Sequence, residues 1–107
     1  MNPTEISVTV EQDRALVKLR GEHEAYSADK LGRQLESLLH EGMPIAVDLS
    51  ETTFVDSTLV GTLLAAKRHA DELELAFLLI MGTSTGWPVR RLLAVTGLGA
   101  TFSTIEQ

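Results

Sequence analysis

The sequence predicts an α/β fold: a mixed, mostly parallel sheet of about five strands, with an N-terminal β-hairpin and three or four helices packed against it. The chain has 107 residues, which suits one compact core. Two kinds of segment alternate along the chain. In one, apolar and polar residues alternate as in a strand, and in the other, apolar residues recur at helical spacing. No repeat, low-complexity tract or linker interrupts this order, so residues 1–107 are expected to form a single domain.

The first two expected strands form a hairpin. Apolar and polar residues alternate over 6–10 and again over 15–19, and residues 12–13 supply the turn. Gly21 is expected to end the second strand. A charged loop near the end of the sheet should follow, and it contains Glu22, His23 and Glu24.

A first helix is expected from Ser27 to Glu41, with Ser27 as its N-cap. Its apolar stripe consists of Leu31, Leu35, Leu38 and Leu39. The run from Pro44 to Leu49 is short, apolar and partly β-branched, which is typical of a central strand buried on both faces.

A second helix is expected over residues 58–71, because leucines recur there at helical spacing and basic residues gather near its C-terminus. Another inner strand should run over residues 75–81.

Residues 82–86 are expected to form a flexible polar loop, after which a third helix should start near Trp87 and Pro88 and run toward Gly97. Trp87 is interpreted as a packing residue at this helix start, in preference to the alternative of a recognition platform. A last edge strand is expected around Phe102 and Ile105.

The composition favours a protein partner. Nine basic and fifteen acidic residues give a net charge of −6, which disfavours nucleic-acid binding because the phosphate backbone would be repelled. The apolar run 75–81 is too short to cross a bilayer, so no membrane insertion is expected. The N-terminus lacks the pattern of a secretion signal and there is no cysteine, so a cytoplasmic location is expected.

The junction Val55-Asp56-Ser57-Thr58 is the most informative feature of the chain. A strand leads there into a helix, whose first unpaired N–H groups and positive dipole end would tolerate a phosphate on a nearby hydroxyl. The simpler interpretation is that Ser57 or Thr58 caps the helix. Local chemistry leaves both interpretations open.

Three segments together resemble the STAS domain family, and within it the stand-alone anti-sigma factor antagonists of bacteria: Gly21–Ala28, Val55–Gly61 and Val89–Leu98. In this family the serine after the aspartate of an Asp-Ser-Ser/Thr-Gly-Leu-Gly pattern is phosphorylated, and Ser57 matches it. The resemblance implies that a kinase of the histidine-kinase-like ATPase type, itself the anti-sigma factor, modifies Ser57, with Thr58 as the alternative site. The unphosphorylated protein would bind this kinase and release the sigma factor, and a serine phosphatase would be a further partner.

The chain departs from the family pattern in this segment, because Leu59-Val60-Gly61 stands where the family has Gly-Leu-Gly, so a leucine replaces the first glycine. Leu59 either packs into the core or protrudes into the docking surface, and its place on the apolar helical stripe favours the core. The resemblance and the expected loop together give the predicted partner-binding residues: Glu22, His23, Glu24, Asp56, Ser57, Thr58, Leu59 and Gly61.

The alternative function is a STAS-like scaffold or transporter-associated subunit that binds its partner constitutively, without phosphorylation. An enzyme is not expected, because the segment around Ser57 lacks the Gly-x-Ser-x-Gly elbow of hydrolases. Residues 82–86 lack the lysine of a phosphate-binding loop, so no cofactor is predicted. The histidines, which show no spacing typical of metal ligands, are expected on the surface or at helix ends; they are His23, His40 and His69.

Overall fold

The computed structural model describes residues 4–23, 25–95 and 103–106. Along the chain the elements are β1 (Glu5–Glu11), β2 (Arg14–His23), α1 (Ala25–His40), β3 (Ile45–Val55), α2 (Ser57–Glu72), β4 (Phe77–Met81), α3 (Trp87–Val95) and β5 (Ser103–Glu106). This order matches the predicted alternation, so the predicted fold class is confirmed.

The strands form one five-stranded sheet in the order β1-β2-β3-β4-β5. β1 and β2 are antiparallel, and every later neighbouring pair is parallel. Gln12 and Asp13 form the hairpin turn with φ of 52° and 63°, the left-handed pair that suits the twist of a two-residue hairpin. The predicted hairpin and its turn are therefore confirmed.

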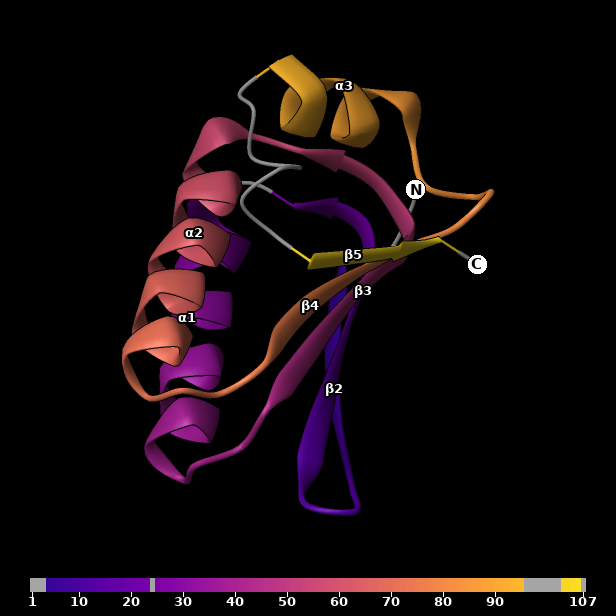
Figure 1. Cartoon of the computed structure of the whole chain (residues 1–107). Helices are drawn as coiled ribbons and strands as arrows, with labels where there is room; N and C mark the ends of the chain where they lie inside the picture. Colours follow the sequence, from indigo (N-terminus) through magenta and orange to yellow (C-terminus); the bar gives the residue numbers. More distant parts are fainter. Residues whose placement is uncertain (1–3, 24, 96–102, 107) are drawn as a thin grey trace.

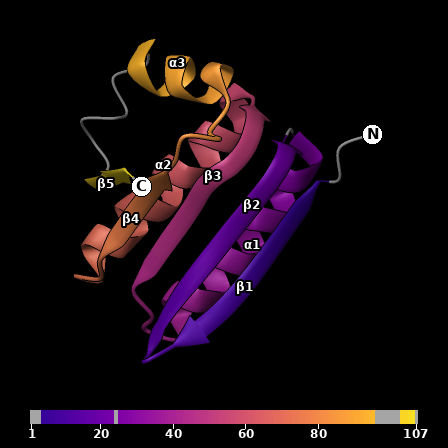
Figure 2. The ribbon, with the colours of Figure 1, turned by 90° about the vertical axis from the view of Figure 1, so that its right-hand side faces the viewer.

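The sheet has helices on one face. α1 and α2 lie side by side against it, whereas α3 lies at the end of the sheet where β3 leads into α2 (Figure 1). After a turn of 90° that brings the sheet toward the viewer, the strands stand in front of both long helices (Figure 2). Within the described residues no helix is long and apolar enough to span a membrane.

The core lies between the sheet and these helices, because alternate strand residues face the apolar helical stripes. Its largest fully buried side chains are Leu19, Leu31, Leu35, Leu39, Leu49, Leu59, Leu63 and Leu79. On β3 only alternate residues of the segment up to Leu49, namely Ile45, Val47 and Leu49, contribute to this core. On the opposite face of this segment Ala46 is half-buried and Asp48 is buried, so the predicted burial of the strand on both faces is confirmed in part, although that face adds no apolar residue to this core.

Several element boundaries differ from the predictions. β3 continues to Val55 instead of ending at Leu49, because β2 pairs with it along its length through two register shifts. α1 starts at Ala25, so Ser27 is a buried residue inside the helix and not its N-cap. The predicted helix end at Gly97 and the strand residue Phe102 lie outside the described residues.

Candidate functional site

The candidate site lies where β3 ends and α2 begins. Val55 is the last strand residue, and Asp56 follows in an extended conformation with φ −99° and ψ 176°. The Asp56 carboxylate accepts a hydrogen bond of 2.9 Å from the Leu59 N–H, so Asp56 is the N-cap of α2. The interpretation of Ser57 or Thr58 as the cap was wrong. Ser57 is the first residue of the helix, and it is exposed.

The first turns of α2 have a buried and an exposed side. Leu59 is fully buried and Val60 nearly so, whereas Thr58 and Gly61 are exposed. The prediction that Leu59 packs into the core is confirmed, so its side chain offers no surface to a partner. A Cβ atom added at Gly61 would meet no atom within 4 Å, which leaves the backbone of α2 bare at this point.

His23 is not in a solvated loop, as predicted, but is the last residue of β2 and fully buried. Its carbonyl oxygen accepts a bond of 3.2 Å from the Asp56 N–H, which ties β2 to the start of α2. Its Nε2 lies 2.9 Å from the Arg20 carbonyl oxygen, and within the described residues its buried Nδ1 has no hydrogen-bond partner. Because its side chain is buried, His23 cannot contact a partner, and its role at the site is the backbone bond that holds the start of α2.

The other predicted site residues of this region differ in position. Glu22 is exposed, but it belongs to β2 and not to a loop, because the strand continues past Gly21. Glu24 lies outside the described residues. His40 is exposed at the end of α1, and the Nδ1 of half-buried His69 lies 2.6 Å from Glu36, so the surface prediction is confirmed for these two histidines.

The buried position of His23 predicts a dependence of stability on pH. Loss of hydration lowers the pKa of His23, since the protonated ring would be charged without water. The unfolded chain takes up this proton near a pH of about 6.5 and the folded chain only at a lower pH. Stability should therefore fall as the pH drops through this range, by at most about 1.4 kcal/mol per pH unit.

Urea unfolding at about pH 7.5 and about pH 5.5, on either side of the ordinary histidine pKa, measures this effect. Glu51 does not contribute to a change over this pH range. Hydrogen bonds from Lys18 and Arg20 lower its pKa, so the stability that Glu51 contributes is lost only when the pH falls below the ordinary pKa of a carboxyl group. The control is His23→Gln, which keeps every carboxyl group. An equal loss of stability in both proteins would contradict the assignment to His23.

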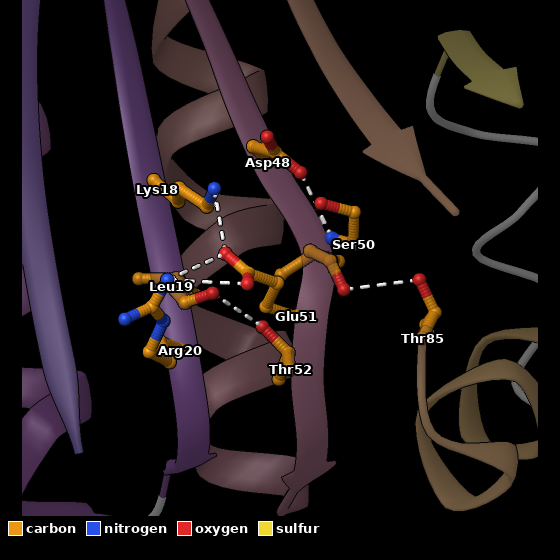
Figure 3. A network of polar contacts seen from close by, with 9 residues as sticks. Lys18, Leu19, Arg20, Asp48, Ser50, Glu51, Thr52 and Thr85 are labelled. Carbon is orange, nitrogen blue, oxygen red and sulfur yellow. Dashed lines mark hydrogen bonds and ion pairs between the residues drawn. The ribbon is translucent and has the colours of Figure 1, made fainter. Parts of the chain in front are cut away.

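The segment 82–86 is a polar loop, as predicted, but buried hydrogen bonds hold it against β3, which the expectation of a flexible loop did not include. The Thr85 hydroxyl donates to the Leu49 carbonyl oxygen at 3.0 Å and accepts from the Gly82 N–H at 2.8 Å. Figure 3 shows Thr85 reaching toward β3, on the side away from the charged cluster of Lys18, Arg20 and Glu51. The Gly86 N–H donates to the Thr52 carbonyl oxygen at 2.8 Å. These bonds determine where α3 begins.

Replacing Gly86 by alanine is expected to destabilise the protein by about 2 kcal/mol, because the new methyl group would overlap packed backbone. A Cβ atom there would lie 2.2 Å from the Thr53 carbonyl oxygen. Gly61→Ala is the matched control and should stabilise the exposed helix by up to about 1 kcal/mol. Chemical unfolding of both variants decides the point, and a Gly86→Ala protein as stable as the wild type would show that the contact relaxes without cost.

α3 brings residues to Ser57 that the sequence analysis did not assign to the site. A surface hollow of about 460 Å³ is lined by Phe54, Val55, Asp56, Ser57, Trp87, Pro88, Arg91 and Leu92. Trp87 is 67% exposed, so its interpretation as a packing residue was wrong. The centre of its ring lies 5.1 Å from the Arg91 guanidinium carbon. In the sequence, the Trp87-Pro88 pair was the signal that could have pointed to this surface. Its position in the same hollow as Ser57 follows only from the hydrogen bonds that anchor residues 82–86 to β3.

The site consists of the exposed Ser57 hydroxyl and the hollow beside it. Among the described residues there is no group of three or more His, Asp or Glu side chains that could hold a metal ion. A larger open hollow of about 780 Å³ lies between α1 and α2, and Glu36 and His69 are part of its lining. Ser57 does not line this second hollow, so the chemistry of the candidate site is confined to the junction of β3, α2 and α3.

Solved structures with the same fold include three regulatory proteins. An anti-sigma factor antagonist from Mycobacterium paratuberculosis has a TM-score of 0.78 and 21% identity, over 95% of this chain and 85% of that one. A putative anti-sigma factor antagonist from Thermotoga maritima has a TM-score of 0.82 and 18% identity, over 95% and 86%. The Bacillus cell fate determinant SpoIIAA in its phosphorylated form has a TM-score of 0.75 and 17% identity, over 98% and 91%.

The family itself follows from the sequence comparison. The family model described as "Mlab, STAS domain" matches residues 6–105, which is nearly the whole chain. The match includes both β-strands of the hairpin, the junction at Ser57 and all three helices described above. The chain belongs to the STAS domain family.

Proposed function

We propose that this protein is an anti-sigma factor antagonist that is switched by phosphorylation of Ser57. One observation carries the proposal: Ser57 is exposed as the first residue of α2, directly after the capping Asp56, at the place where the sequence resemblance puts the phosphorylated serine. Similar folds in an anti-sigma factor antagonist and in a phosphorylated SpoIIAA support it.

In its unphosphorylated form the protein binds an anti-sigma factor serine kinase of the histidine-kinase-like ATPase type, and the sigma factor is released. The docking surface consists of the exposed residues at the start of α2, namely Ser57, Thr58 and Gly61, together with Asp56. The missing side chain of Gly61 lets a partner approach the helix backbone closely. Since Leu59 is buried, its replacement of the family glycine does not change this surface.

The switch is a phosphoryl transfer within the complex. The Ser57 oxygen forms a bond to the γ-phosphorus of ATP, the bond between that phosphorus and the β–γ bridging oxygen breaks, and ADP leaves. The hydroxyl proton passes to a base of the kinase. The product carries about −1.5 to −2 additional charges at this surface, and a serine phosphatase would reverse the change by hydrolysis.

Binding, and not catalysis by this chain, is the proposed activity. The Asp56 carboxylate is engaged as the helix cap, and His23 is buried beneath the junction, so neither is placed to activate the Ser57 hydroxyl. The net charge of −6 favours a protein partner over nucleic acid. A location in the cytoplasm, where a sigma factor acts, belongs to the same proposal.

The test is to incubate the purified protein with ATP and a purified anti-sigma factor serine kinase of the proposed type, and to measure the intact mass and the modified residue. Ser57→Ala and Thr58→Ala are run in parallel, and both should fold because Asp56 supplies the cap. One added phosphate that is lost only in Ser57→Ala supports the switch. No phosphate, with a kinase that modifies another antagonist, would instead favour a STAS scaffold or transporter-associated subunit with constitutive binding.

A further inference from the structure

We propose that Arg91 is the intramolecular partner of the phosphate on Ser57, so that in the phosphorylated protein an ion pair joins α3 to α2. The inference rests on the proposed phosphorylation of Ser57. Its starting point is the hollow of about 460 Å³ beside the junction, because Ser57 lines it from α2 and Arg91 lines it from α3.

Arg91 is the side chain on α3 that is available for this role. It is exposed, and in the described residues its guanidinium has a ring contact with Trp87 but no ion pair with a carboxylate. The neighbouring Arg90 is already engaged, since its Nη2 donates a bond of 2.6 Å to the Gly82 carbonyl oxygen. Arg90 thus holds the loop, while Arg91 can turn toward a new anion.

The phosphate is a stronger partner for Arg91 than the carboxylate in the same hollow. Asp56 also lines it, but Oδ1 of Asp56 accepts the Leu59 N–H as the cap of α2. A phosphate carries up to about two charges and three acceptor oxygens, and it can receive two parallel N–H bonds from one guanidinium. The planar face of the guanidinium can remain near the Trp87 ring while its edge binds the phosphate.

The position of α3 makes the pairing possible without refolding. Thr85 and Gly86 bind the carbonyl oxygens of Leu49 and Thr52, so the start of α3 is fixed to the strand that leads to Ser57. Only the side chain of Arg91 has to move. Phosphorylation would therefore change the charge of the hollow and the position of Arg91 together, on the surface that the partner meets.

The experiment places phosphoserine at position 57 during synthesis, so that no kinase is needed. Phosphorus NMR then measures the second pKa of the phosphate in the wild-type background, in Arg91→Gln and in Arg68→Gln. Arg68 is an exposed residue of α2, about 16 Å from Ser57 along the helix at a rise of about 1.5 Å per residue, and the control removes the same charge.

An arginine beside the phosphate favours its dianion, so the second pKa in Arg91→Gln should be higher by about 0.5 unit, roughly a threefold change in proton affinity. Arg68→Gln should match the wild type. Trp87 is the single tryptophan, so its fluorescence should change on phosphorylation in the wild type and in Arg68→Gln but not in Arg91→Gln.

A second pKa in Arg91→Gln no higher than in Arg68→Gln would overturn the inference. This outcome would leave the proposed function intact, because it concerns only the partner of the phosphate. Conversely, failure of any kinase to modify Ser57 would end the proposed switch without changing the measured pKa values. Thermal unfolding of the variants checks that they are folded, as expected for changes of exposed side chains.

Discussion

Phosphorylation of Ser57 is expected to weaken binding to the cognate kinase by at least about 100-fold, equivalent to about 2.7 kcal/mol, while the fold stays intact. A docking surface that fits a neutral hydroxyl would have to desolvate and accommodate a dianion next to Asp56. The domain itself tolerates the phosphate, because Ser57 is exposed and the buried Leu59 and Val60 hold the helix in place.

Isothermal titration of the kinase with the phosphoserine-57 protein and with the unmodified protein measures this loss. Ser57→Ala is the control and should retain binding within about tenfold, since a single exposed hydroxyl contributes at most about 1.5 kcal/mol through a neutral hydrogen bond. The circular dichroism of the two forms should coincide. Equal affinities, or a large change in circular dichroism, would contradict a switch that acts at the docking surface alone.

Replacing Leu59 by glycine, the residue of the family pattern, is expected to destabilise this protein by about 4 kcal/mol. Leu59 is fully buried in the core between α2 and the sheet. Its truncation to alanine costs about 3 kcal/mol through lost burial and a cavity, and glycine adds about 1 kcal/mol within a helix. The core of this chain has adapted to the larger residue.

Urea unfolding of Leu59→Ala and Leu59→Gly tests the two contributions separately. Thr58→Ala is the neighbouring control and should change the free energy of unfolding by less than about 0.5 kcal/mol, because Thr58 is exposed. A loss below about 1 kcal/mol in Leu59→Gly would mean that the core closes around the missing side chain. Binding to the kinase should survive in whatever fraction remains folded.

The order of elements was predictable because it depends on short-range periodicity. Alternation over residues 6–10 and 15–19 predicted the hairpin, and the leucine stripe of the second helix predicted the burial of Leu59. The N-cap of α2 is a local feature too, since aspartate is among the favoured capping residues, but the adjacent Ser57 and Thr58 belong to the same favoured class and the sequence does not separate the three. That residues 1–107 form one domain stays a prediction.

The surroundings of Ser57 could not be predicted, because they depend on contacts between distant segments. His23 is fully buried at the end of β2, where the Asp56 N–H at the start of α2 binds its carbonyl oxygen. Charged neighbours on both sides in the sequence made it look like part of a solvated loop. A local pattern carries no information about which segment covers a strand end.

By itself, the sequence determined the α/β order, the helix that starts at the Asp-Ser junction and the residue that fills the core at position 59. Tertiary structure alone decided that Trp87 is exposed and that Arg91 and Ser57 line the same hollow. The physical reason is the range of the interactions. Helical and strand periodicity act over a few residues, whereas the bond from Thr85 to Leu49 joins positions 36 residues apart and places α3 at the site.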